Sequence, residues 1–348
     1  MQVSFWSFIK AQLAQVPPVE KHDLTGKTVV VIGANTGIGY ETAKHFATMN
    51  PARLIMGCRN REKGAAAVGN LEDSTGFDKA EVWLIDLCSF ASVKAFAAKL
   101  DKEVDRLDIL VSNAAVMPME YATTEDNWET SLQVNYLASA LLIILLLPKM
   151  FRTVAMSTSE PRVVIVSSET HQNGKIPDKA FQSASALEVF NGRQFCHPYN
   201  HLEIYRLTKL LTVLLTLALT DHLPSDRRTI IVDCVNPGFC YSKIRRGIHG
   251  VLRVAMMLLL EKLLAKTAEE GARQVIWGSI ATPQEGVNSL KGAYVSSARI
   301  TEPSDFIISE KGKQFRDLVW NDTVRILSKV DPRVQATVEK YLRKGDGI

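Results

Sequence analysis

The sequence has few of the residues that build disulfide frameworks, metal centres or nucleic-acid surfaces. It contains five cysteines in 348 residues, an odd number, and no two of them form a C-x-x-C pair. This argues against a disulfide scaffold, a zinc site and a redox dithiol. The net charge is only +4, and no lysine and arginine cluster accompanies it. We therefore expect an intracellular, cytoplasmic protein with reduced thiols that binds neither metal nor nucleic acid.

Hydrophobic runs long enough to cross a membrane are also missing. Leu137–Leu147 has eleven residues and ends at Pro148, so we expect a buried core or interface helix there and no transmembrane segment. A second apolar run, Val251–Leu264, is interrupted by charges. A helix that covers the substrate is the favoured interpretation, and peripheral contact with a membrane is the alternative. The N-terminus lacks the basic segment of a secretory signal, and we interpret residues 1–26 as a lead-in helix.

Short apolar runs rich in β-branched residues alternate with longer segments of helical periodicity. Continuous apolar strands separated by helices predict a parallel sheet with helices on both faces. We expect a single Rossmann-type, doubly wound α/β domain over residues 27–296, and an extension, 297–348, that is irregular before a last helix at Asp331–Leu342. The seven expected strands are Thr28–Ile32, Arg53–Met56, Glu81–Ile85, Ile109–Ser112, Arg162–Ser167, Thr229–Val235 and Ala293–Ser296. The main expected helices are Ile38–Met49, Ser92–Leu100, Trp128–Leu147, Glu203–Asp221 and Ala268–Ile280.

A glycine-rich loop, Gly33-Ala34-Asn35-Thr36-Gly37-Ile38-Gly39, follows the first strand and opens a helix. Glycines let the backbone turn tightly and approach a pyrophosphate, whose charge then meets the N-terminus of the helix. The G-x-x-x-G-x-G spacing differs from the general G-x-G-x-x-G fingerprint, yet the loop stands in the required strand–loop–helix context. It therefore predicts a dinucleotide site.

The end of the second strand bears on the choice of nucleotide. Proteins that bind NAD usually place an Asp or Glu there to accept hydrogen bonds from the ribose hydroxyls. This chain has Arg59 instead, with Arg61 or Lys63 in support. Since a guanidinium binds phosphate oxygens well, the substitution favours NADP(H). Solvated surface arginines are the alternative interpretation.

Tyr205 and Lys209 form a Y-x-x-x-K pattern on an expected helix. The i, i+4 spacing places the phenol and the ammonium on one face. A tyrosine with the usual pKa of about 10 is a poor acid or base catalyst at neutral pH, and a neighbouring lysine lowers that pKa by stabilising the phenolate. Ser168 follows the fifth strand, where its hydroxyl can hydrogen-bond a substrate oxygen as negative charge develops.

Together with Asn135, these residues resemble the Asn-Ser-Tyr-Lys tetrad of the short-chain dehydrogenase/reductases, and the glycine loop resembles that family's cofactor loop. The resemblance implies that Asn135, Ser168, Tyr205 and Lys209 are catalytic, with Asn135 holding a water that links Lys209 to solvent. Ser168 is preferred because the family's serine is the second of such a pair; Ser167, on the other side of the strand, is the alternative. The expected cofactor contacts are Gly33, Asn35, Thr36, Gly37, Ile38, Gly39, Arg59, Asp86, Leu87, Asn113, Ala114, Tyr205, Lys209, Pro237, Gly238 and Ser242.

Three further motifs resemble one branch of that family. They are G-C-R-N after the second strand, D-L-C-S-F-A-S-V after the third and S-S-E-T-H after the fifth. The branch is retinol-dehydrogenase-like and WW-domain-oxidoreductase-like, and it has many fungal members in secondary-metabolite pathways. His171 belongs to this signature, and we interpret it as a packed or loop residue rather than a catalyst.

These patterns predict an NADP(H)-dependent oxidoreductase that interconverts a carbonyl and an alcohol by hydride transfer, with Tyr205 as acid/base. The apolar insertion before Tyr205 and a lid at about 239–266 favour a bulky apolar substrate, as in secondary metabolism. A homodimer is a further expectation. The alternatives are a catalytically weak NADP(H)-binding sensor or scaffold and, behind it, a Rossmann-type methyltransferase, which has no use for the Ser168, Tyr205 and Lys209 set.

Overall fold

The fold is built on one eight-stranded sheet. The computed structural model describes residues 9–10, 12–156, 160–196, 201–225, 229–242, 258 and 260–342. The strand order is β3-β2-β1-β4-β5-β6-β7-β8, in which β1 to β7 are parallel and β8 pairs antiparallel with β7. The strand order reverses at β1, so the segments that leave the carboxyl ends of β1 and β4 run in opposite directions. Doubly wound sheets bind ligands at such a place. The predicted fold class is confirmed.

The described elements have the following bounds. The strands are β1 (Thr28–Ile32), β2 (Arg53–Cys58), β3 (Ala80–Leu84), β4 (Ile109–Ser112), β5 (Arg162–Val166), β6 (Ile231–Asn236), β7 (Tyr294–Ser296) and β8 (Ile300–Thr301). The longer helices are α2 (Gly37–Ala47), α3 (Arg61–Thr75), α4 (Phe90–Glu103), α6 (Ala138–Met156), α10 (His201–His222), α12 (Ala268–Ile280), α14 (Glu310–Val330) and α15 (Arg333–Tyr341). The shorter helices are α5 (Thr130–Leu132), η1 (Gln133–Leu137), η2 (Glu169–Asn173), α7 (Asp178–Gln182), α8 (Ala186–Asn191), α9 (Arg193–Cys196), η4 (Val287–Leu290) and α13 (Asp305–Ile308).

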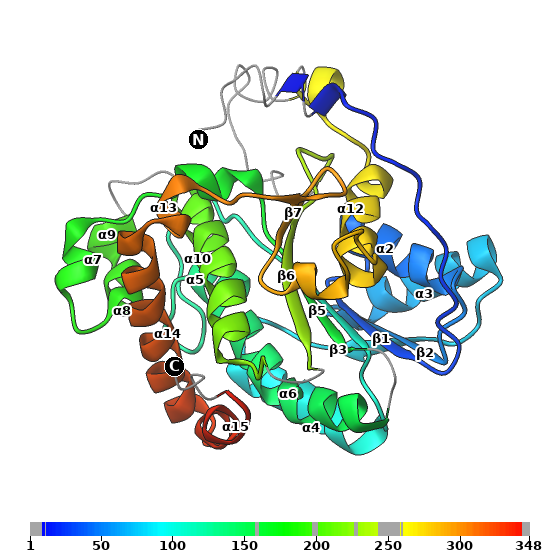
Figure 1. Cartoon of the computed structure of the whole chain (residues 1–348), viewed down its shortest axis with the longest axis horizontal. Coiled ribbons are helices and arrows are strands. Elements are labelled where there is room, and N and C mark those ends of the chain that lie inside the picture. The colour runs from blue at the N-terminus through cyan, green and yellow to red at the C-terminus, as the bar shows by residue number, and fades with distance from the viewer. Residues whose placement is uncertain are drawn as a thin grey trace.

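Two apolar layers lie on the two faces of the sheet. Along β1, Val30 and Ile32 pack with side chains of α4, α6 and α10, whereas Val29 and Val31 pack with side chains of α2, α3 and α12 (Figure 1). This alternation follows from the two-residue period of a strand. Since both faces are covered, the central strands are continuously apolar, which is the pattern that made them recognisable in the sequence.

The long apolar helix differs from the prediction. We expected the run from Leu137 to end at Pro148, and this is wrong, because α6 continues through Pro148 to Met156. Proline costs a helix one backbone hydrogen bond, and here the burial of flanking apolar side chains such as Met150 offsets that cost. The whole helical stretch Thr130–Met156 is long and apolar enough to cross a membrane by length and composition. However, 83% of its apolar window is buried inside the protein, as in a core helix.

The C-terminal extension also differs from the prediction. The chain after Ser296 is not irregular before its last helix, since α14 spans 21 residues and buries Phe315, Val319 and Leu327 in the core that α10 shares. The missed signal is helical spacing, because four and then eight residues separate these three side chains. In Figure 1, α14 runs beside α10, while α15 packs against α6.

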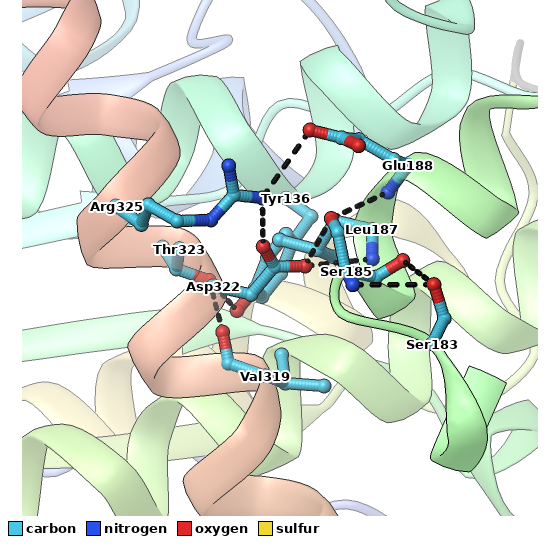
Figure 2. A network of polar contacts seen from close by, with 9 residues as sticks. All are labelled: Tyr136, Ser183, Ser185, Leu187, Glu188, Val319, Asp322, Thr323 and Arg325. Atoms are coloured by element: carbon cyan, nitrogen blue, oxygen red, sulfur yellow. Dashed lines mark hydrogen bonds and ion pairs between the residues drawn. The ribbon is translucent and has the colours of Figure 1, made fainter.

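A polar network joins α14 to the segment before α10 (Figure 2). The carboxylate of Asp322 accepts hydrogen bonds from Ser185 Oγ at 2.7 Å and from the backbone N–H of Leu187 at 2.9 Å. Arg325 pairs with the other oxygen of Asp322 at 2.6 Å. The extension therefore holds the insertion between Ser168 and α10 in place.

Two predicted segments fall partly outside the described residues. Residues 243–257 and 259 of the expected lid, 239–266, are not described, so most of the apolar run Val251–Leu264 and its contact with a membrane lie outside the structure. Of the lead-in, 1–26, the structure describes residues 9–10 and 12–26, in which the short helix ends before the two prolines.

Candidate active site

The glycine loop has a geometry that requires its glycines. Gly33 and Gly37 have φ values of +77° and +60°, in the left-handed region that L side chains rarely adopt. A Cβ at Gly39 would lie 2.3 Å from the carbonyl oxygen of Gly33 and 2.5 Å from Nδ2 of Asn113. Thr36 stands at the N-cap of α2 in extended conformation and makes no side-chain capping hydrogen bond. The loop thus presents bare backbone at the start of a helix, which suits a pyrophosphate.

Asn113 and Ala114 support the glycine loop from the end of β4. The Nδ2 group of Asn113 donates to the carbonyl oxygens of Ile32 and Gly33, each at 3.2 Å. A Cβ at Gly33 would lie 2.9 Å from the Cβ of Ala114. These contacts explain why the amide of Asn113 and the small side chain of Ala114 stand here. Both predicted residues lie against the glycine loop.

The expected nucleotide-selecting residues gather at the ends of β2 and β3. Arg59 is exposed. Burial raises the pKa of the Cys88 thiol; the negative charge of Asp86 raises this pKa further, and the positive charge of Arg59 lowers it. Both charges therefore lie close to Cys88. One oxygen of Asp86 accepts from the backbone N–H of Cys88 at 2.9 Å. Leu87 is buried, and Gln133 Nε2 donates to its carbonyl oxygen at 3.4 Å. In the first turn of α3, Lys63 donates its backbone N–H to the Asn60 cap.

Tyr205 and Lys209 share a face of α10, as the i, i+4 spacing predicts. The Lys209 ammonium lies 5.6 Å from the centroid of the Tyr205 ring. It donates to the carbonyl oxygen of Val166 at 2.7 Å, at the end of β5. Burial lowers the pKa of Lys209 to about 8, so the group is still mainly cationic at neutral pH. A buried cation at this distance stabilises a phenolate more than an exposed one does, because water screens it less.

The two serines that follow β5 point in different directions. Ser167 is 2% exposed; its hydroxyl donates to the carbonyl oxygen of Lys209 at 3.1 Å and accepts from Thr212 Oγ1 at 3.1 Å. Ser168 is half-buried, and its Oγ accepts only a 3.3 Å hydrogen bond from the backbone N–H of Thr170. Ser167 therefore serves to pack β5 on α10, and the geometry favours Ser168 as the serine that meets a substrate.

Asn135 lies in the π-helix η1, a distortion often found at functional sites. Its Oδ1 accepts from the backbone N–H of Val116 at 2.8 Å, and its Nδ2 donates to the carbonyl oxygen of Val116 and to Thr208 Oγ1. Because Thr208 precedes Lys209, Asn135 is tied directly to the helix of the Y-x-x-x-K pattern. A water held by Asn135 stays a prediction.

The Pro237–Gly238 turn follows β6 and borders a small cavity of about 10 Å³, which has room for one water-sized group. Gly238 has a φ of +82°, and its backbone N–H donates to Oδ1 of Asn236 at 3.0 Å. Sequence reasoning missed several polar residues that line this cavity: Gln12, Glu169, Lys266, Gln274, Ser296 and Ser297. Only Glu169 left a signal, as the neighbour of Ser168. Ser242, the last predicted cofactor contact, is exposed at the edge of the described chain.

His171 is a fully buried, neutral histidine. The backbone N–H of Ser304 donates to its Nε2 at 3.1 Å, so the proton lies on Nδ1, which donates to the carbonyl oxygen of Ser168 at 2.8 Å. Its ring meets Tyr294 edge to face with centroids 4.7 Å apart. These contacts fit the prediction of a packed residue. Within the described ranges, no group of three or more His, Cys, Asp or Glu residues could hold a metal ion.

Comparisons with known proteins give matches to one family. A family model described as short chain dehydrogenase matches residues 27–186. A short chain dehydrogenase/reductase of the fungus Cryptosporiopsis sp. (strain 8999) is 32% identical over 94% of this chain and 98% of its own length. Retinol dehydrogenase 12 of Homo sapiens is 34% identical over 87% of each chain.

Solved structures share the fold at lower identity. A short chain dehydrogenase from Shigella flexneri complexed with NADP has a TM-score of 0.55 and 21% identity, over 80% of this chain and 100% of its own. A short chain dehydrogenase/reductase from Burkholderia phymatum in complex with NAD has a TM-score of 0.57 and 16% identity, over 79% and 90%.

Proposed function

Because the chain belongs to the short-chain dehydrogenase/reductase family, and resembles its retinol-dehydrogenase-like and fungal members, we propose that it is an NADP(H)-dependent oxidoreductase that interconverts a carbonyl and an alcohol. The observation that carries the proposal is the buried Lys209 ammonium, 5.6 Å from the Tyr205 ring and bonded to the end of β5, directly before the two serines. This arrangement provides an acid/base group, a charge that tunes it and a hydroxyl for a substrate oxygen.

The cofactor fits the residues present, since a Cβ at Gly39 would fill the cradle at the start of α2. The bound nicotinamide supplies or accepts the hydride. Tyr205 gives its phenolic proton to the substrate oxygen during reduction and takes it back during oxidation. Lys209 stabilises the phenolate, and Ser168 donates a hydrogen bond to the same oxygen as it becomes negative.

The test of this mechanism is Tyr205→Phe. The variant lacks only the hydroxyl group, so we expect NADPH binding within about twofold of wild type and turnover of carbonyl substrates reduced by at least about 10²-fold. NADPH oxidation over a panel of aldehydes, ketones and quinones measures turnover, and quenching of protein fluorescence measures binding. Substantial residual turnover in Tyr205→Phe would refute the acid/base assignment, and a wild type that binds NADPH without turnover would favour a sensor.

The preference for NADP(H) rests on the end of β2, where Cys58 is followed by Arg59 and Asn60 and no acidic residue is present. A guanidinium–phosphate hydrogen bond contributes about 1.5–3 kcal/mol, which corresponds to roughly a 10- to 100-fold difference in affinity. We expect Arg59→Ala to weaken NADPH binding by about that factor and to leave NADH binding nearly unchanged. The matched control is Arg152→Ala, which removes an exposed arginine from α6 that has no expected part in cofactor binding. Equal loss of NADPH and NADH affinity in Arg59→Ala would contradict this cofactor choice.

The substrate class is also part of the proposal. The insertion before α10 is rich in aromatic residues, and Phe181 and Phe190 pack it on Phe315 of α14. We propose a small-molecule carbonyl or alcohol with a bulky apolar body, in keeping with a role in secondary metabolism. The panel of carbonyl compounds above, ranked by kcat/KM, tests this, and a preference for small polar aldehydes would contradict it.

A further inference from the structure

A polar cavity lies beside the Pro237–Gly238 turn, at the carboxyl ends of β6 and β7. Its walls come from five parts of the chain: the lead-in, the residue after Ser168, the turn itself, α12 with the segment before it, and the end of β7. The lead-in is held there because Arg273 of α12 donates to the carbonyl oxygen of Val16 at 2.9 Å, and Val16 is 6% exposed. The cavity is therefore a small, partly open site formed by packing.

Two hydrogen-bond acceptors on these walls lack partners in the described part of the chain. Gln12 is 7% exposed, and its Oε1 has no hydrogen-bond partner. Its side-chain amide lies about 3.5 Å from where a Cβ of Gly238 would stand. Glu169 directly follows Ser168, is partly buried, and forms no hydrogen bond through its carboxyl group with the described residues. A buried acceptor without a partner costs free energy, so a ligand that supplies the donor is favoured here.

The charges in the cavity indicate what kind of donor it accepts. Burial raises the pKa of Glu169 to about 7, and the opposing attraction of Lys266 lowers it. Burial in turn lowers the pKa of Lys266. Glu169 and Lys266 line the same cavity with opposite charges, so their fields oppose each other and a net charge on the ligand gains little. A neutral group is therefore the best match.

We propose that this cavity is a recognition subsite for a neutral O–H or N–H donor on a molecule bound at the Ser168 site, with Gln12 Oε1 and the Glu169 carboxyl group as acceptors. The inference rests on the proposed function, because the ligand must lie beside Ser168. Two molecules of that reaction can carry such a donor: a hydroxylated substrate, or the cofactor through its carboxamide.

Two matched pairs of probes distinguish these sources. NADPH and its reduced 3-acetylpyridine analogue differ in that the analogue has a methyl group in place of the amide NH₂. The ketones 6-hydroxy-1-tetralone and 6-methoxy-1-tetralone differ only in the phenolic O–H. Kd is measured by fluorescence titration, for the cofactors with the protein alone and for the tetralones with NADPH-saturated protein, in wild type, Gln12→Leu and Glu169→Leu. Gln15→Leu makes the same chemical change at an exposed lead-in position and is the control.

We expect wild type to prefer the donor-bearing member of one pair by about tenfold, the effect of one well-formed hydrogen bond to a buried acceptor. Gln12→Leu and Glu169→Leu should bring that ratio close to one, and Gln15→Leu should leave it unchanged. Preference in the cofactor pair assigns the subsite to the carboxamide, and preference in the tetralone pair assigns it to the substrate. The absence of a preference in both pairs, or ratios unaffected by both variants, overturns the proposal. Failure of the proposed function is distinct, since it shows as wild type without NADPH binding or Tyr205→Phe with full turnover.

Discussion

Replacement of His171 by leucine is expected to destabilise the fold in a pH-dependent way. The side chain is 0% exposed and joins the carbonyl oxygen of Ser168, at 2.8 Å, to the backbone N–H of Ser304, at 3.1 Å. Leucine fills a similar volume but neither donates nor accepts. The Ser304 amide then loses its acceptor, and the Ser168 carbonyl keeps only the 3.2 Å bond from the backbone N–H of residue 171.

The size of the effect follows from the cost of unsatisfied buried groups. The unsatisfied Ser304 amide costs about 1–3 kcal/mol and the lost hydrogen bond to the Ser168 carbonyl about 0.5–1.5 kcal/mol, so we expect His171→Leu to lower the free energy of unfolding by about 1.5–4.5 kcal/mol at pH 7. Burial also lowers the pKa of His171 to about 4, against an ordinary value of about 6.5 in the unfolded chain. Between these two values the unfolded state binds more protons, so the wild type loses stability as the pH falls from 6.5 towards 4.

The assay is urea unfolding of both proteins at pH 7 and pH 5. Leucine does not titrate, so only the wild type loses stability through this position as the pH falls. The difference in unfolding free energy between wild type and His171→Leu should therefore be smaller at pH 5 than at pH 7 by about 2 kcal/mol. Other titrating groups cancel in this difference when they are the same in both proteins. A gap that is equal at both pH values would show that His171 is not held neutral by burial. A variant as stable as wild type at pH 7 would refute the hydrogen-bond argument itself.

Two further predictions concern the glycine loop and α14. Gly39→Ala should weaken NADPH binding by at least about tenfold and cost about 1–3 kcal/mol of stability, because its Cβ would meet the carbonyl oxygen of Gly33 at 2.3 Å. Gly69→Ala, where the added Cβ meets nothing within 4 Å, should be neutral or stabilising by up to about 1 kcal/mol; fluorescence titration and urea unfolding measure both variants. Asp322→Ala should cost about 2–4 kcal/mol, since it leaves buried donors without an acceptor, whereas Arg325→Ala, at the 41% exposed end of the pair, should cost under about 1 kcal/mol. Equal losses in these last two variants, measured by urea unfolding, would contradict the network in Figure 2.

The parts of the fold that were predictable have local causes. A strand such as Thr28–Ile32 is buried on both faces, so four of its five residues are apolar and the run stands out. The pairing of Tyr205 with Lys209 follows from helical spacing alone. By contrast, the end of the apolar helix was misjudged at Pro148, because the cost of proline is local while the burial that offsets it is contributed by distant elements.

The candidate site divides in the same way. Residue type and order along the chain were enough to place Gly39, Ser168, Tyr205 and Lys209 at the carboxyl edge of a doubly wound sheet, because each belongs to a short motif with its own physical requirement. Long-range packing alone decided that Gln12 of the lead-in shares a cavity with Glu169, since 157 positions separate them and no local pattern couples them. The sequence by itself therefore determined that Tyr205 and Lys209 share a helix face, and the tertiary structure decided which polar groups line the cavity beside Pro237 and Gly238, because those groups come from segments that meet only when the chain folds.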